Sequence, residues 1–93
     1  GMGGQKCSAL SRLYVEAQVA DALIERLVRQ IAQIRIGDPS CRAHWLGPVI
    51  NAAAHAGYAG FVDELRRDGA RLIAGGRPLT DGDLARGYYV EPV

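Results

Sequence analysis

The segment 17–36 carries the most regular pattern in this 93-residue chain. Apolar side chains recur there at spacings of three and four, at Ala20, Leu23, Ile24, Leu27, Val28, Ile31 and Ile34. That spacing places them on one face of an α-helix, with polar residues such as Asp21 and Gln33 on the other. Glu25 and Arg29 are spaced for an i,i+4 ion pair worth about 0.3 kcal/mol. Gly37, as a residue just past the helix, and Pro39 favour an end to it.

A second helix is predicted over 52–68, because Asn51 is a good N-cap and Gly69 favours an end after Asp68. Its apolar positions are Ala54, Tyr58, Phe61, Val62 and Leu65. Short β-prone runs predict strands at 12–15, 71–74 and 88–90, with a polar loop at 77–87. The order strand, helix, helix, strand, strand predicts a single α/β layer over residues 1–93, rather than a bundle or a sandwich.

Composition narrows the classes of partner. Eleven basic residues against ten acidic ones give a net charge of +1, which does not suggest nucleic acid or a membrane. No apolar run is long enough to span a bilayer, and no secretory signal is visible. Two cysteines, Cys7 and Cys41, make no disulfide framework, so a cytoplasmic, reducing setting is expected. Gly1 ahead of Met2 is interpreted as a tag remnant.

The most informative chemistry lies in Gly4-Gln5-Lys6-Cys7-Ser8. Glycine before a cysteine allows a close approach of the backbone to a ligand. If a short helical turn begins near Cys7, its N–H groups favour a thiolate, and Lys6 adds positive charge. The same N–H groups would stabilise an oxyanion formed on an attacked carbonyl. From these residues alone, a nucleophilic cysteine and an inert one both remain open.

This turn, extended to Ala9, resembles the active-site cysteine motif of the aldehyde dehydrogenase superfamily. Further segments resemble the family's succeeding elements in the same order: a strand at 11–15, a helix at 23–28, turns at 36–39 and 47–50, and two strands at 68–76 and 87–92. The form Gln5-Lys6-Cys7-Ser8-Ala9, followed by Ser11-Arg12, is most similar to 1-pyrroline-5-carboxylate dehydrogenases. The resemblance therefore implies a partial aldehyde dehydrogenase catalytic domain over nearly the whole chain.

The resemblance also implies a reaction. In the family, a cysteine thiolate attacks an aldehyde, a hydride passes to NAD or NADP, and the resulting thioester is hydrolysed to a carboxylate. Cys7 matches the nucleophile, its backbone N–H matches one oxyanion donor, and Ser8 is expected to touch the substrate. Glutamate semialdehyde is the aldehyde that the subfamily implies.

Several expected parts of the family's site are missing. The family's cofactor-binding domain, oxyanion-hole asparagine and general-base glutamate all precede the cysteine, so the cofactor-binding domain is expected to be absent here. Met2 and Gly3 replace an aromatic and an acidic residue of the motif, and Ala54 and His55 replace residues near the family's cofactor. The isolated chain is therefore expected to be inactive and to bind no cofactor tightly.

Other interpretations remain beside this one. A truncated, non-catalytic α/β protein would associate with itself through uncovered apolar faces, which predicts a homo-oligomer. A thiol-reactive binder with an accessible Cys7 is a further alternative. His44 and Cys41 form only one close pair, so no metal site is expected, and His44 and His55 are interpreted as surface residues of a loop and a helix. Gly75-Gly76 is interpreted as a turn at the end of a strand, not as a phosphate loop.

Overall fold

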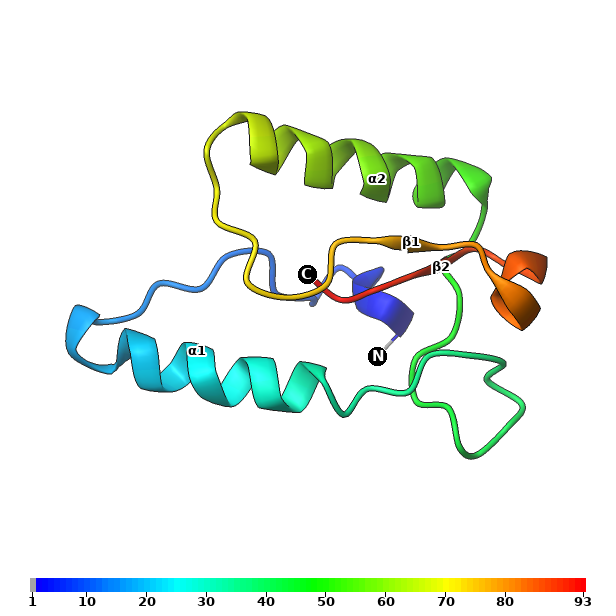
Figure 1. Ribbon diagram of the computed structural model, residues 1–93, viewed down its shortest axis with the longest axis horizontal. Helices are drawn as coiled ribbons and strands as arrows, with labels where there is room; N and C mark the ends of the chain where they lie inside the picture. The colour runs from blue at the N-terminus through cyan, green and yellow to red at the C-terminus, as the bar shows by residue number, and fades with distance from the viewer. Residues whose placement is uncertain (1) are drawn as a thin grey trace.

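The computed structural model describes residues 2–93, so Gly1, interpreted above as a tag remnant, lies outside the described residues. Two long helices, α1 and α2, lie on either side of a two-stranded antiparallel hairpin, β1–β2 (Figure 1). The elements are, in order, the 3₁₀ helix η1 (Met2–Gly4), α1 (Ala17–Ile31), α2 (Ala52–Arg67), β1 (Pro78–Leu79), the 3₁₀ helix η2 (Gly82–Arg86) and β2 (Tyr89–Val90). Pro78 pairs with Val90, and Leu79 pairs with Tyr89. The predicted α/β class with two main helices is confirmed.

Both ends of α2 are fixed by the residues that the sequence indicated. The Asn51 side chain accepts a hydrogen bond from the Ala54 N–H at 2.9 Å. At the other end Gly69 has a φ of 82°, a conformation that glycine adopts without steric cost. The Ala70 N–H donates to the Leu65 carbonyl at 2.9 Å, and the Gly69 N–H donates to the Arg66 carbonyl at 3.2 Å. These bonds form a Schellman motif, and the predicted caps are confirmed.

The first helix is shorter than predicted. It ends at Ile31 instead of reaching Ile36, because the chain beyond it pairs with another segment. Ile36 forms a parallel bridge with Leu46, and the Gly37 N–H donates to the Leu46 carbonyl at 3.0 Å. The prediction that Gly37 ends the helix is therefore wrong. Gly37 is buried under the His44 ring, where a β-carbon would lie 2.4 Å from Nδ1. Its missing side chain makes room for that ring.

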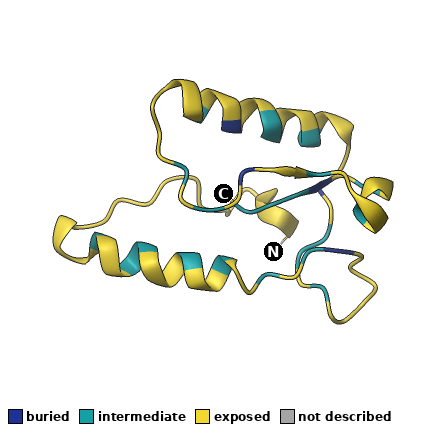
Figure 2. Cartoon of the chain, in the orientation of Figure 1, coloured by how far each residue is buried: buried dark blue, intermediate teal, exposed yellow. Residues whose placement is uncertain are grey.

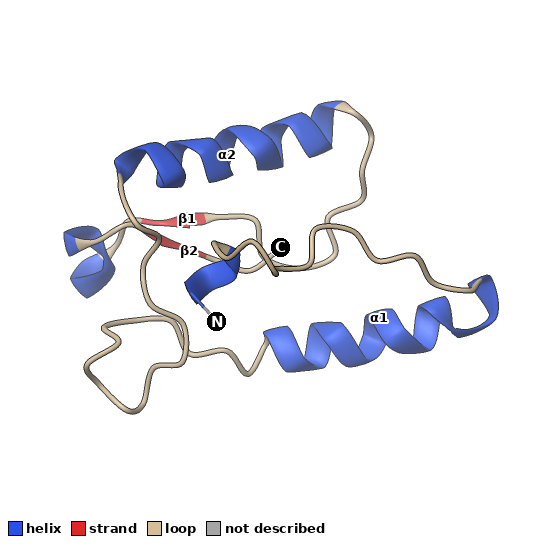
Figure 3. Cartoon of the chain, turned by 180° about the vertical axis from the view of Figure 1, so that it is seen from behind, coloured by secondary structure: helices blue, strands red, loops and turns tan. Residues whose placement is uncertain are grey.

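Two predicted strands are wrong. Residues 12–15 and 71–74 lie in the loops of Figure 3 that precede α1 and follow α2. Within residues 2–93, no backbone hydrogen bond is made by 12–15 or 71–74. Strand propensity reflects a side chain's fit to a pleated surface, but a ladder also needs a neighbouring strand. The third prediction, 88–90, is confirmed as β2, whose partner β1 falls inside the predicted loop 77–87.

Side chains of α2 attach the helix to the hairpin. The Tyr58 hydroxyl donates to the Glu91 carbonyl, and a ring nitrogen of His55 lies 3.1 Å from the Tyr89 carbonyl oxygen. Burial raises the pKa of Tyr58 above its ordinary value. Across the hairpin, Arg77 donates two hydrogen bonds to the Glu91 carboxylate, at 2.7 and 3.1 Å. The α2–hairpin unit is therefore joined by polar contacts as well as by packing.

The core lies on one side of the molecule. Val49, Val62 and Tyr89 are its buried hydrophobic residues, and Val62 is only 1% exposed. Figure 2 shows burial concentrated on α2, the hairpin and the adjoining loop, while α1 has no buried residue. The chain exposes 7486 Å², whereas a compact monomer of this size exposes about 5,200 Å². Within residues 2–93, no helix combines the length and the apolar character needed to cross a bilayer.

Candidate functional site

Cys7 lies in an exposed turn between η1 and the irregular segment 10–15. Figure 1 shows this part of the chain in blue, running from the N-terminus toward α1. Gly3 and Gly4 have φ values of 58° and 78°, so the chain enters the turn through a left-handed backbone. The Ala9 N–H donates to the Lys6 carbonyl at 2.8 Å and closes the turn around Cys7 and Ser8. The glycines and the turn thus place Cys7 and Ser8 side by side at the surface.

The turn leaves chemical groups open for an incoming ligand. Among the described residues, the backbone N–H groups of Cys7 and Ser8 donate to no acceptor. Cys7 is a free thiol, as is the exposed Cys41. Adjacent N–H groups beside a thiol are the arrangement that stabilises an oxyanion when the sulfur attacks a carbonyl. The turn can therefore offer a nucleophile and oxyanion donors from one short segment.

Gln5 anchors this turn, a role that the sequence interpretation missed. Its side-chain oxygen accepts from the Ile50 N–H at 2.9 Å, and its side-chain nitrogen donates to the Met2 carbonyl at 2.9 Å. A carboxamide carries both donors and an acceptor, so it can join two backbone segments at once. A glutamine inside a glycine-rich loop was the available signal, although nothing in the sequence identifies Ile50 as its partner.

His55 and His44 have structural partners. His55 is half-buried against β2, with its ring tilted by 49° to that of Tyr88 at a centroid distance of 6.1 Å. Its interpretation as a surface histidine is therefore wrong, because the hydrogen bond to Tyr89 draws it inward. His44 is half-buried over Gly37, and its Nδ1 lies 3.1 Å from the Asp38 carbonyl oxygen. In the described part of the chain, no three His, Cys, Asp or Glu side chains form a group suited to a metal.

The loop around His44 is held by Asp38. The Asp38 carboxylate accepts from the Ser40 N–H at 2.8 Å, and this hydrogen bond lowers the pKa of Asp38 below its ordinary value. Cys41 and Trp45, in the same loop, are exposed. Trp45 is 78% exposed and therefore does not cap the core.

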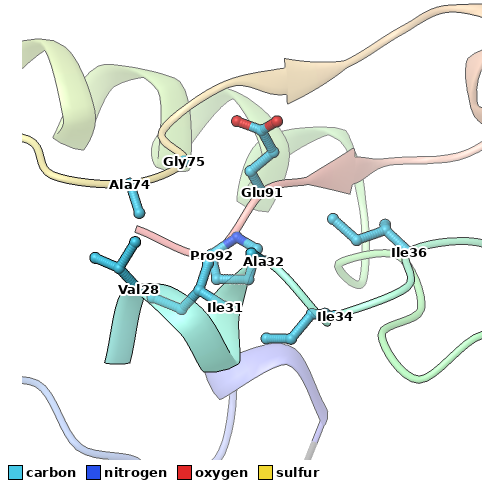
Figure 4. A pocket seen from close by; sticks show the side chains of 9 residues that line it. All are labelled: Val28, Ile31, Ala32, Ile34, Ile36, Ala74, Gly75, Glu91 and Pro92. Atoms are coloured by element: carbon cyan, nitrogen blue, oxygen red, sulfur yellow. The ribbon is translucent and has the colours of Figure 1, made fainter. Parts of the chain in front are cut away.

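Two apolar grooves separate α1 from the rest of the molecule, and Cys7 lines neither. One has a volume of about 410 Å³ and lies between Leu27 of α1, Phe61 of α2 and the segment 70–74. The other, about 330 Å³, is drawn in Figure 4, where Val28 and Ile31 face Ala74 and Pro92. The Glu91 carboxylate points away from these apolar side chains in that view. The grooves are therefore uncovered apolar surfaces and are not part of the cysteine site.

The fold is that of an α/β segment with an exposed cysteine on a glycine-rich turn. The model of the aldehyde dehydrogenase family matches residues 1–93. Betaine aldehyde dehydrogenase from Staphylococcus aureus, solved in complex with NAD+, is 28% identical with a TM-score of 0.92, covering 98% of this chain and 18% of that one. HpcC from Thermus thermophilus is 33% identical with a TM-score of 0.90, covering 97% and 18%.

The chain belongs to the aldehyde dehydrogenase family, a family of oxidoreductases. The resemblance inferred from the cysteine turn and the collinear segments is confirmed at that level. The chain spans 18% of the length of the solved structures that it matches. Its fold is accordingly a partial aldehyde dehydrogenase domain.

Proposed function

We propose that residues 1–93 are the cysteine-bearing segment of the catalytic domain of an NAD-dependent aldehyde dehydrogenase, with Cys7 as its nucleophile. The observation that carries the proposal is the exposed Cys7 turn, which lies within a family match covering the whole chain. NAD is preferred to NADP because the similar S. aureus enzyme was solved with NAD+.

The steps assigned to this chain concern the aldehyde. The Cys7 thiolate attacks the carbonyl carbon, and the carbon–sulfur bond forms as the carbonyl π electrons move to oxygen. The N–H groups of Cys7 and Ser8, which are open among the described residues, donate to that oxygen. In the complete enzyme, a bound nicotinamide cofactor supplies the hydride acceptor for the resulting thiohemiacetal.

The cofactor does not fit the two grooves described above. The two grooves are lined mainly by apolar side chains, with Arg71 as the one basic residue among those that line them. The phosphates of a dinucleotide need basic side chains or several convergent N–H groups. We therefore propose that the isolated chain binds NAD and NADP only weakly and completes no oxidation.

Formation of NADH tests the inactivity directly. The purified chain, mixed with glutamate semialdehyde and NAD, is expected to form no more NADH than the Cys7→Ser variant. NADH formation that depends on Cys7 would contradict the proposal. Glutamate semialdehyde is the chosen aldehyde because the Gln5–Ala9 turn and Ser11-Arg12 are most similar to 1-pyrroline-5-carboxylate dehydrogenases.

Ser8 is proposed to contact that substrate, since it is exposed and adjacent to Cys7. Ser8→Ala is then expected to weaken the covalent adduct of Cys7 with glutamate semialdehyde, and to leave the adduct with acetaldehyde unchanged. Adduct populations can be compared by NMR with aldehydes labelled at the carbonyl carbon. An equal loss with both aldehydes would assign Ser8 to the turn and not to the substrate.

The large exposed surface favours a second candidate function, a non-catalytic α/β protein that associates with itself. The exposed area exceeds that of a compact monomer, and the apolar face of α1 borders both grooves. Sedimentation at micromolar concentration is then expected to show a homo-oligomer. Leu27→Asp, inside the larger groove, should shift it toward monomer, whereas Val19→Asp, on α1 but outside both grooves, should not. A monomeric unaltered chain would remove this candidate.

A further inference from the structure

The Gln5 side chain joins two segments that are 45 residues apart in the sequence. Its oxygen accepts from the Ile50 N–H at 2.9 Å, while its nitrogen donates to the Met2 carbonyl at 2.9 Å. The Gln5 backbone N–H donates to the same Met2 carbonyl at 3.1 Å. Both ends of the carboxamide are therefore engaged within the fold, which fixes the direction of the side chain.

Ile50 lies between the hairpin contact of Val49 and the start of α2. It lies directly before Asn51, the N-cap of α2. It follows Val49, which is buried and donates its N–H to the Tyr88 carbonyl at 2.8 Å. A hydrogen bond to Ile50 therefore fixes the position of Gln5 relative to both α2 and the hairpin.

No other hydrogen bond or ion pair among the described residues ties 2–15 to the chain beyond α1. The residues from Met2 to Val15 are all exposed, so packing supplies little to fix the turn. Cys7 is two residues from Gln5, which keeps their α-carbons within about 7.6 Å. Among the described residues, the hydrogen bonding of the Cys7 turn to the chain beyond α1 thus depends on this one side-chain contact.

We propose that Gln5 is a positioning residue, which clamps the Cys7 turn to the start of α2 through the Ile50 N–H. The clamp holds the thiol and the N–H groups of Cys7 and Ser8 in one orientation relative to α2. Its catalytic consequence rests on the proposed role of Cys7 as nucleophile. The clamp itself is a property of the fold and can be tested without any turnover.

Amide exchange in the full 93-residue chain tests the clamp. In Gln5→Met, which keeps the length and removes the acceptor, exchange at the Ile50 N–H is expected to become about fivefold faster. Gln5→Glu keeps an oxygen acceptor for the Ile50 N–H but loses the donor to the Met2 carbonyl, so exchange should lie between that of Gln5→Met and that of the unaltered chain. Gln18→Met, at an exposed glutamine of α1, is the matched control and should change nothing at Ile50.

A spectroscopic measurement reports the orientation of the turn. A nitroxide attached to Cys7 in a Cys41→Ser chain should broaden the amide signals of Asn51 and Ala52. This broadening is expected to fall in Gln5→Met and to be partly restored in Gln5→Glu, which keeps the acceptor for Ile50. A role confined to general stability would not separate these two variants.

Several results would overturn the proposal. These are an unprotected Ile50 amide in the unaltered chain, equal exchange in Gln5→Met, and exchange in Gln5→Glu as fast as in Gln5→Met. Loss of protection at Val62 as well would show that Gln5 holds the fold as a whole and does not position the turn. A failure of Cys7 to form an aldehyde adduct, with the exchange data as expected, would instead contradict the proposed function alone.

Discussion

The two halves of the molecule contrast in how they are covered. The α2–hairpin half contains Val62 and Tyr89, which are buried, and is joined by side-chain hydrogen bonds from His55 and Tyr58. The other half, formed by α1 and the Cys7 turn, has no buried residue in α1 and a fully exposed turn. An amphipathic pattern is therefore enough to form both helices, but only a facing layer buries the pattern.

The helix starts repeat this contrast. Asn51 caps α2 with a side-chain hydrogen bond, whereas Glu16 precedes α1 without one. The half that carries the proposed nucleophile is thus the less stabilised half. A site that is completed by residues outside its own segment is expected to be exposed and weakly held within that segment.

Truncation of matched valines gives the strongest test of this contrast. Val62→Ala is expected to lower the free energy of unfolding by about 2 kcal/mol, because it removes buried methyl groups and leaves a cavity. Val19→Ala on α1, where the side chain is 53% exposed, should change it by less than about 0.5 kcal/mol. Urea denaturation of both variants measures the difference, and equal losses would break the contrast.

The caps give the next largest difference. Asn51→Ala should cost about 1 kcal/mol, since it removes the acceptor for the Ala54 N–H. Glu16→Ala should cost close to nothing, because its side chain makes no cap bond. Helix content followed by circular dichroism during thermal unfolding reports both variants. A larger loss from Glu16→Ala would show that α1 is held more firmly than its exposure indicates.

Two tyrosine substitutions, one in each half, test whether a side-chain hydrogen bond stabilises the α2–hairpin half. Tyr58→Phe removes the donor to the Glu91 carbonyl and should cost about 0.7 kcal/mol. Tyr14→Phe serves as the control, because Tyr14 is 89% exposed and precedes α1. The comparison is made by urea denaturation, and no loss in Tyr58→Phe would remove the hydroxyl as a link between α2 and the hairpin.

The smallest effect is expected from the Arg77–Glu91 ion pair. Hydrogen bonds from Arg77 hold the pKa of Glu91 below its ordinary value of 4.5. A carboxyl whose folded pKa is lowered stabilises the fold above its ordinary pKa and loses that contribution as the pH falls through the lowered value. The unaltered chain should therefore be more stable than Glu91→Gln at pH 7, and the gap should close in acid. A gap that widens in acid would reverse the sign of this coupling.

Local signals predicted much of the fold. Periodicity located both helices, and Asn51 and Gly69 predicted the ends of α2, because caps depend on neighbouring residues alone. The segments 12–15 and 71–74 were predicted as strands, but sheet formation needs a partner that local sequence does not reveal. β1 was missed since its two residues include a proline, and the early end of α1 follows from the distant bridge of Ile36 to Leu46.

The candidate site likewise has a part that local sequence predicted and a part that it did not. The family motif identified the turn that holds Cys7, and the glycines before it have the left-handed backbone that favours this residue type. The hydrogen bonds between Gln5 and Ile50 and between His55 and Tyr89 join residues that are far apart in the sequence. Neither contact is visible in a local pattern, which is why the partners of these side chains were not predicted.

Cys7 is the thiol proposed to attack an aldehyde, and Cys41 offers an internal comparison because it is also exposed and free. The decisive measurement is NMR of the chain with an aldehyde labelled with ¹³C at the carbonyl carbon. A thiohemiacetal signal is expected in the unaltered chain and in Cys41→Ser, and it should be largely lost in Cys7→Ser. Equal adduct at both cysteines, or adduct that survives Cys7→Ser, would contradict the account.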